Sequence, residues 1–257
     1  MADRARPAPF DLARSDALGR VPHGFFGSAG GAHQFGFGGP GGEGEVRALR
    51  AAAADALVPC ASPVAPHQVH SSDCLAVTEP WPDQAEGRPV ADALVTDRPG
   101  IVLGIVTADC GPVLFADAQA GVVAAAHAGW RGAQSGVLDN TLAAMESLGA
   151  RRERIVAALG PTIAQPSYEV DAPFRDHFGP DDARHFAPAP PRDGRARWHF
   201  DLPGYIGARL EALEIGTFDD LALDTFALAD RYHSYRRASL AGAPSYGRQI
   251  SAIARPE

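Results

Sequence analysis

The chain has 257 residues, a length that buries a sizeable core without disulfides or a structural metal. All 23 basic residues are arginine, so chemistry that depends on a Schiff-base lysine or a phosphate-loop lysine is excluded. The 31 acidic residues give a net charge of −8, whereas nucleic acids and anionic membranes bind basic surfaces. We therefore expect neither as a partner and favour a small-molecule ligand.

The cysteine pattern and the hydropathy indicate a cytoplasmic protein. Cys60, Cys74 and Cys110 are too few and too irregularly spaced for a disulfide framework, and the N-terminus lacks the charged-then-apolar pattern of a signal peptide. No apolar run approaches the roughly 18 to 20 residues that cross a bilayer. We expect a monomer or a small homo-oligomer.

The first 57 residues contain two irregular segments and one helix pattern. Residues 1–20 are polar and proline-punctuated, which predicts a poorly ordered N-terminal segment. Residues 27–44 read GSAGGAHQFGFGGPGGEG, and this density of glycine predicts a mobile loop. Residues 43–57 begin with acids and continue with Leu49 and Leu57 among alanines, which predicts a helix packed on a sheet.

The central part of the chain favours buried strands. Its runs are of strand length, rich in Val, Ile and Leu, and bounded by Gly, Pro or Asp. They cover residues 74–78, 101–107, 112–117 and 121–127.

Helices and strands alternate after this region. Residues 132–150 have apolar side chains at roughly helical spacing and reach a helix-ending glycine at Gly149, which predicts one continuous helix. Residues 154–160 predict a short strand, and residues 172–178 predict a short helix.

The C-terminal part contains one strong helix pattern. Residues 188–197 form a polar, proline-rich stretch that we expect as a surface insertion, and residues 200–216 predict a helix capped by Asp201. Residues 218–254 alternate short strand-like pieces. No repeat or linker interrupts this order, so we expect a single mixed α/β domain over residues 1–257.

Three residues capable of binding a metal stand in unusual local contexts. His70 lies in HQVH, Cys110 in TADC and His127 in HAGWRG. One thiolate and two imidazoles suit Zn²⁺, and three protein ligands leave the fourth tetrahedral position free for water or substrate. The trio therefore indicates a catalytic metal site.

The placement of these residues supports the interpretation. In an extended HQVH segment, His67 and His70 would point to opposite faces, so only one would reach a shared site. Cys110 and His127 follow predicted strands at their carboxyl ends, where ligands bind in open α/β sheets. Taken singly, each histidine fits a structural role and Cys110 fits a small buried apolar residue; the combination favours a metal.

The motifs QVHSSD, ADALVT, TADCGPVLFAD, AAHAGWRG, LGPTI and HSYRR occur in this order and resemble the bacterial laccase-domain family, also called multicopper polyphenol oxidases. The resemblance extends from about His23 to Ile253. It implies that His70, Cys110 and His127 hold one zinc, and that the fold is a single-domain layered α-β-β-α sandwich with mixed sheets. It also implies a purine nucleoside phosphorylase that cleaves adenosine, inosine or methylthioadenosine and deaminates adenosine.

The residues themselves agree better with nucleoside chemistry than with the oxidase name. A blue copper plus a trinuclear cluster is typically served by about ten histidines, several in His-x-His pairs, whereas this chain has 9 histidines and no such pair. A three-ligand zinc suits adenosine deamination, so we expect zinc rather than copper. Phosphorolysis additionally needs arginine for phosphate and an acid for the leaving purine.

Residues within the matched motifs are candidates for these tasks. Arg131, Arg236 and Arg237 could bind phosphate through charge-assisted hydrogen bonds, or could be structural ion-pairing residues. Asp109 could be a catalytic proton shuttle, a residue that anchors the metal site or a loop cap. His67 is a further substrate-binding candidate, and the role of His233 stays open.

One region departs from the family pattern. The family usually has a Thr-Arg pair, then Gly-Gly-Val-Ser and later Ser-Leu-Asn near the N-terminus, whereas this chain has Ser28 or a neighbour in place of the arginine and lacks the Ser-Leu-Asn piece. If that region binds phosphate or ribose, phosphorolysis would be weaker, altered or lost.

Other functions stay open at this stage. Cys110 and His127 could form the dyad of a cysteine hydrolase, in which the thiolate attacks the substrate. The protein could also be a copper-dependent polyphenol oxidase, or a nucleoside-binding homologue without catalytic activity.

Overall fold

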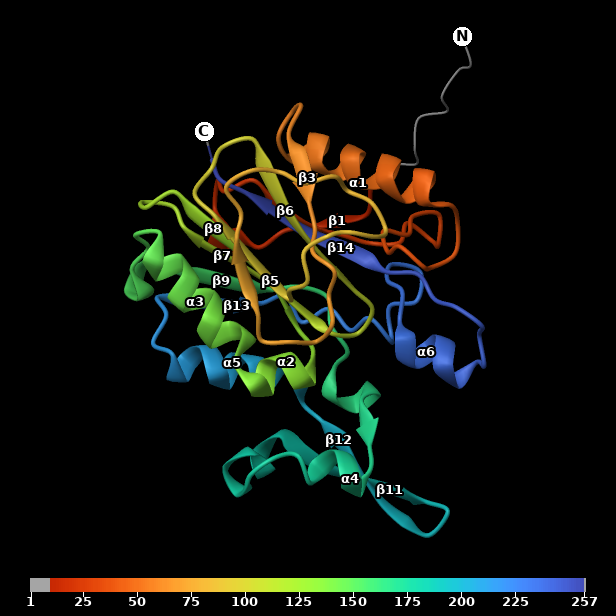
Figure 1. Cartoon of the computed structure of the whole chain (residues 1–257). Coiled ribbons are helices and arrows are strands. Elements are labelled where there is room, and N and C mark those ends of the chain that lie inside the picture. Colours follow the sequence, from red (N-terminus) through yellow and green to blue (C-terminus); the bar gives the residue numbers. More distant parts are fainter. Residues whose placement is uncertain (1–9, 257) are drawn as a thin grey trace.

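Two β-sheets pack face to face, and helices cover both outer faces (Figure 1). The computed structural model describes residues 10–256. The expected mixed α/β fold, a layered α-β-β-α sandwich with mixed sheets, is confirmed.

The first sheet has five strands and is covered by helix α1 (Glu43–Leu57). Its only parallel pair is the one at the β3 edge. Ala53 and Ala54 of α1 pack with Phe26, Phe35 and Ile250 on the outer face of the sheet. The strand order is β1 (Leu12–Ala13), β2 (His23–Phe26), β14 (Gln249–Ala254), β6 (Ile101–Thr107) and β3 (Ser62–Val64).

The second sheet has six strands, antiparallel at its centre and parallel at both edges. Helices α2 (Trp130–Ser135), α3 (Val137–Ser147) and α5 (Leu202–Ala212) lie on its outer side (Figure 1). The strand order is β13 (Thr217–Asp220), β9 (Val156–Leu159), β7 (Gly111–Asp117), β8 (Val122–Ala128), β5 (Ala93–Thr96) and β4 (Cys74–Ala76).

The apolar runs of the sequence arise because the central strands are buried on both faces. On β8, Val123 and Ala125 face the layer between the sheets, and Ala124 and Ala126 face the helices. Strand β6 belongs to the first sheet and β7 to the second, so residues 108–110 carry the chain from one sheet to the other. This crossing places Cys110 at the end of the sandwich.

A small third sheet extends from one end of the molecule (Figure 1). It contains β10 (Glu169–Val170), β12 (Arg195–Phe200) and β11 (Phe186–Arg192), with α4 (Ala172–Arg175) beside it and α6 (Tyr235–Leu240) elsewhere in the C-terminal part. Short 3-10 helices cover Asp16–Leu18, Arg152–Arg154, Gln165–Ser167 and Pro180–His185.

Several predicted elements match closely. The helix over residues 43–57 and the strand over residues 101–107 have the expected bounds. The helix predicted over residues 200–216 is α5, and its cap is confirmed because the Asp201 carboxylate accepts a hydrogen bond from the Gly204 amide at 3.0 Å.

The surface insertion predicted at 188–197 is confirmed: most of its residues are exposed, and they form the hairpin of strands β11 and β12. Two predictions about the second half were wrong. The single helix over residues 132–150 is two helices, because Gly136 between α2 and α3 takes a left-handed conformation with φ of 100°. The tail contains α6 besides strands, with Ser234 as its cap, since the Ser234 hydroxyl accepts a hydrogen bond from the Arg237 amide.

The N-terminal part is more ordered than expected. Of the segment 1–20, residues 1–9 lie outside the described residues, whereas residues 10–20 include β1, which pairs with β2. Residues 27–42 form no helix or strand, as their glycine content predicts. However, residues 27–28 and 33–36 of this glycine-rich loop are buried, and Phe35 packs under α1, so part of the loop belongs to the core.

Among residues 10–256, no helix combines the length and apolar character needed to cross a membrane.

The break at Gly136 gives a test of the fold. We expect Gly136→Ala to lower the free energy of unfolding by about 1–2 kcal/mol, because alanine is strained at this positive φ. Gly44→Ala in α1 is the matched control: no atom obstructs a Cβ there, and a helical alanine stabilises by up to about 1 kcal/mol. Urea unfolding of both variants measures the difference, and equal effects would contradict the assigned helix break.

Candidate metal and substrate site

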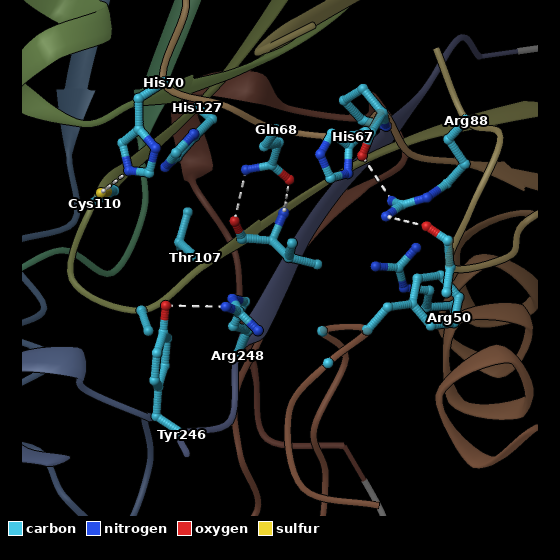
Figure 2. A pocket seen from close by; sticks show the side chains of 17 residues that line it. Arg50, His67, Gln68, His70, Arg88, Thr107, Cys110, His127, Tyr246 and Arg248 are labelled. Carbon is cyan, nitrogen blue, oxygen red and sulfur yellow. Dashed lines mark hydrogen bonds between the residues drawn. The ribbon is translucent and has the colours of Figure 1, made fainter. Parts of the chain in front are cut away.

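A cavity of about 370 Å³ opens at the end of the sandwich where β6 crosses to β7. This volume falls in the range of small-molecule sites, roughly 300–1,000 Å³. Its walls come from the glycine-rich loop, α1, the HQVH segment, the end of β6, β8 and the segment before β14. Ten of the lining residues are labelled in Figure 2: Arg50, His67, Gln68, His70, Arg88, Thr107, Cys110, His127, Tyr246 and Arg248.

The predicted metal trio comes together at one side of this cavity (Figure 2). The ligand atoms of His70, Cys110 and His127 all lie within 4.8 Å of one another, and Cys110 Sγ is 3.8 Å from His70 Nε2. Zinc bonds of about 2.0–2.3 Å place tetrahedral ligand atoms roughly 3.3–3.8 Å apart. The trio can hold a metal ion. Within residues 10–256, no other group of three or more His, Cys, Asp or Glu residues has its ligand atoms arranged in this way.

His67 and His70 both line the cavity, contrary to the expectation that they face opposite ways. The expectation assumed an extended segment. His70 instead has a positive φ of 64°, and only His67 makes a β-bridge, to Val90. The turn brings the His70 ring to the same cavity.

Asp92 organises the trio, although the sequence analysis did not single it out. This fully buried carboxylate accepts hydrogen bonds from the amides of Val69, His70 and Ser71 at 3.2, 3.0 and 2.5 Å. Its Oδ1 also lies 2.8 Å from Nδ1 of His127. Carboxylate–histidine–metal arrangements of this kind fix the tautomer and orientation of the ligand. An aspartate directly before the apolar residues 93–95 of β5 was the available sequence signal.

Electrostatic coupling favours the charged forms of Cys110, His127 and Asp92. Burial by itself would raise the pKa of Asp92, but the hydrogen bond and charge of His127 outweigh burial and lower it to about 2. Burial disfavours charge on both Cys110 and His127 too, yet their mutual attraction lowers the pKa of Cys110 to about 6 and raises that of His127 to about 9. A thiolate is the form of cysteine that binds metal.

Asp109 lies next to the trio in sequence but does not line the cavity. Its carboxylate accepts hydrogen bonds from Thr225 Oγ1 at 2.7 Å, Ser234 Oγ at 3.0 Å and the Arg236 amide at 2.6 Å. Burial raises its pKa, although these hydrogen bonds oppose the shift. Asp109 therefore anchors the start of α6 to the crossing between the sheets.

The three arginines selected from motifs also lie outside this cavity. Arg237 donates to the carbonyls of Thr225, Phe226 and Tyr232, so its guanidinium holds the chain before α6. Arg236 lines a second hollow of about 320 Å³.

This second hollow is aromatic and lies on the side of Trp130 and Tyr168. Arg236 places Cζ 5.4 Å from the centre of the Tyr168 ring, and exposed Arg131 places Cζ 4.8 Å from the centre of the Trp130 ring. The structure thus places His67 in the same cavity as the metal trio, but not Arg131, Arg236 or Arg237.

His233 has a structural environment. Its Nε2 lies 2.8 Å from the carbonyl oxygen of His33, and its ring packs against the backbone of Gly247. The pair ties the glycine-rich loop to the segment before β14.

A different set of arginines lines the cavity: Arg50, Arg88 and Arg248. Arg50 could have been noticed, because it shares the buried stripe of α1 with Val46, Ala53 and Ala54 at helical spacing. Arg88 and Arg248 carry no comparable signal in the sequence.

The family model for the multi-copper polyphenol oxidoreductase laccase matches residues 35–256. The chain belongs to this family. The motif resemblance found in the sequence is thereby confirmed.

Relatives with curated names carry the name purine nucleoside phosphorylase. One from Streptomyces coelicolor is 38% identical over 200 residues, covering 77% of this chain and 80% of the relative. Another, from Deinococcus radiodurans, is 43% identical over 161 residues, covering 60% of this chain and 58% of the relative. The match with the second therefore spans under two thirds of its length.

Solved structures show the same fold. A Neisseria meningitidis protein matches with a TM-score of 0.81 and 29% identity, over 97% of this chain and 100% of that one. The Bacillus licheniformis hypothetical protein YfiH matches with a TM-score of 0.82 and 25% identity, over 97% of both chains.

Gly129, in the HAGWRG motif of this laccase-family chain, gives a steric test of the metal site. A Cβ at this position would lie 2.9 Å from Cys110 Sγ and 3.0 Å from His70 Cδ2. We expect Gly129→Ala to weaken zinc binding by about tenfold or more without removing a ligand. Zinc competition with a chelator measures the effect, and Gly179→Ala, where a Cβ meets no atom within 4 Å, is the control.

Asp92→Asn tests the orienting role of the carboxylate. Asparagine replaces one of the two carboxylate oxygens with an NH2 group that donates and cannot accept, so part of the hydrogen bonds from His127 and the Val69–Ser71 amides is lost. We expect zinc affinity to fall by about 10–100-fold. Asp73→Asn, at a neighbouring exposed aspartate, should bind zinc as the unmodified protein does. Unchanged zinc affinity in Asp92→Asn would show that the trio orients itself without the carboxylate.

Proposed function

We propose that this protein is a zinc-dependent purine nucleoside phosphorylase that also deaminates adenosine. The observation that carries the proposal is a three-ligand metal site at the wall of a cavity of nucleoside size. The names of the relatives support the choice of purine nucleosides and phosphate as substrates.

The donor set fits zinc. Two imidazoles and a thiolate bind zinc in tetrahedral geometry, and they also bind blue copper when a weak axial ligand such as methionine is present. Within the described residues the sole methionine is Met145, which is buried in the core under α3 and does not line the cavity. Zinc is therefore the better match, and a multi-copper oxidase would need further clusters of histidine.

A bound zinc supplies a Lewis acid that polarises a substrate oxygen or activates water. The chain supplies the rest: Asp92 holds the His127 ring, while Asp109 positions the crossing that carries Cys110. His67 lines the cavity, where its imidazole can exchange a proton with the leaving purine. Arg236, which lines the aromatic hollow, and Arg131, which lies over the Trp130 ring, would act on a substrate that also reaches that hollow.

A cysteine hydrolase is the second candidate, because Cys110, His127 and Asp92 have the order of contacts of a Cys-His-Asp triad. The thiolate–imidazolium pair and the orienting carboxylate are both present. His70 distinguishes the two functions, since a triad does not need it, whereas the metal site does.

The activity is tested with adenosine, inosine and methylthioadenosine, each with and without inorganic phosphate. We expect phosphate-dependent release of purine base and ribose 1-phosphate, and conversion of adenosine to inosine. His70→Ala should lower zinc content and reduce the turnover of every active substrate by about 100-fold or more. If His70→Ala lost its zinc and kept its turnover, the triad would be supported; no product with any nucleoside would refute the proposed activity.

A further inference from the structure

Three arginines line the part of the cavity that lies away from the metal trio. Figure 2 shows Arg50 and Arg88 close together on that side and Arg248 nearer the middle. They come from three separate parts of the chain: α1, the loop before β5 and the segment before β14. The comparisons and the motif resemblance assign no role to this cluster.

Each guanidinium is held in place by part of its donors. Arg50 donates through Nε to the Phe35 carbonyl and through Nη1 to Asp83, at 2.7 and 2.6 Å. Arg88 donates through Nη1 to the Pro66 carbonyl at 2.7 Å, and Arg248 through Nη2 to the Tyr246 hydroxyl at 2.9 Å.

An aromatic ring completes this support. The Phe37 ring lies against two of the groups, with its centre 4.3 Å from Arg50 Cζ and 5.0 Å from Arg88 Cζ. Guanidiniums fixed in this way lose little freedom when they bind a ligand.

The remaining donors point to a missing acceptor. Nη2 of Arg50, Nε of Arg88 and Nη1 of Arg248 are buried without a hydrogen-bond partner, and Arg50 is only 1% exposed. A buried donor without a partner is costly, so native proteins rarely leave one unmatched. The hydroxyl of Thr107, also in the cavity wall, is likewise buried and unpartnered.

The charge balance points to an anion. Asp83 forms an ion pair with Arg50, and no acid pairs in this way with Arg88 or Arg248 among the described residues. Burial lowers the pKa of both Arg50 and Arg88. The positive charge of a neighbouring arginine adds to the shift in each, and the negative charge of Asp83 opposes it. A bound dianion would relieve this repulsion.

We propose that Arg50, Arg88 and Arg248 form a phosphoryl-binding subsite at the end of the cavity away from the metal trio. The inference rests on the proposed nucleoside chemistry for its choice of ligand. Arginine binds phosphoryl oxygens through planar, often bidentate hydrogen bonds. The phosphoryl group belongs either to inorganic phosphate as co-substrate or to the 5′-phosphate of a purine nucleotide.

The glycine-rich loop builds this subsite. Its Phe35 carbonyl and Phe37 ring hold Arg50, and Gly36 lets Arg248 lie against the backbone. A Cβ on Gly36 would lie 2.7 Å from Arg248 Cδ and 2.9 Å from its Nη1. Gly36→Ala therefore displaces one guanidinium without removing any charge.

The test is calorimetric binding of inorganic phosphate and of adenosine 5′-monophosphate to the zinc-loaded protein. Arg88→Gln and Arg248→Gln should weaken binding of the phosphoryl ligand by about tenfold or more, the loss expected for a charge-assisted hydrogen bond. Gly36→Ala should weaken it in the same direction. Arg98→Gln, at an exposed arginine at the far end of β6, is the control and should bind as the unmodified protein does.

Zinc content and adenosine affinity are measured in the same variants, and both should stay within about twofold of the unmodified protein. If phosphate binds and the arginine substitutions weaken that binding, the subsite is the co-substrate site. If adenosine 5′-monophosphate binds more tightly than adenosine and the substitutions remove the difference, the subsite binds a nucleotide. Binding of both ligands unchanged in all three cavity variants, or no binding of either by the unmodified protein, would overturn the subsite. If the subsite binds phosphate but no ribose 1-phosphate forms, the phosphorylase proposal fails and the subsite stands.

Discussion

The site depends on the hydrogen bonds of the buried Asp92 carboxylate. This carboxylate accepts hydrogen bonds from three amides of the 69–71 turn, and it also contacts the imidazole of His127. A carboxylate in the interior is stable only when several donors surround it, and here the donors belong to two of the three metal-binding segments. The same contacts that make Asp92 tolerable in the core therefore fix His70 and His127 relative to each other.

Much of the sandwich could be predicted because its strands carry an unmixed apolar signal. Strand β6 and helix α1 have the bounds that the sequence indicates, and Cys110 and His127 lie at strand ends as expected. Two predictions failed because of local backbone conformation. Gly136 and His70 adopt positive φ values, which cannot be predicted from the periodicity of apolar residues. The arginine cluster could not be predicted, because its three residues come from distant segments and meet only after folding. Arg50 was the one sequence signal, since it lies on the apolar stripe of a predicted helix.

The glycine-rich loop supports the cavity wall without supplying charge to it. The loop contributes no arginine of its own, and Ser28 is buried with its amide bound to the Arg231 carbonyl. Its glycines let the backbone pass close to long side chains from other segments. Positive charge in the cavity is thus supplied by α1, the loop before β5 and the segment before β14, and the loop supports it.

The crossing between β6 and β7 has a consequence for how the protein holds together. Residues 108–110 join the two sheets at one end of the sandwich, and the two histidines grouped with Cys110 come from the 69–71 turn and from β8. An ion bound there would cross-link the 69–71 turn, the 108–110 crossing and strand β8 of the second sheet at a single point. Because ligands that bind only the folded state raise its stability by mass action, the metal supply of the cell would set how often this end of the molecule opens.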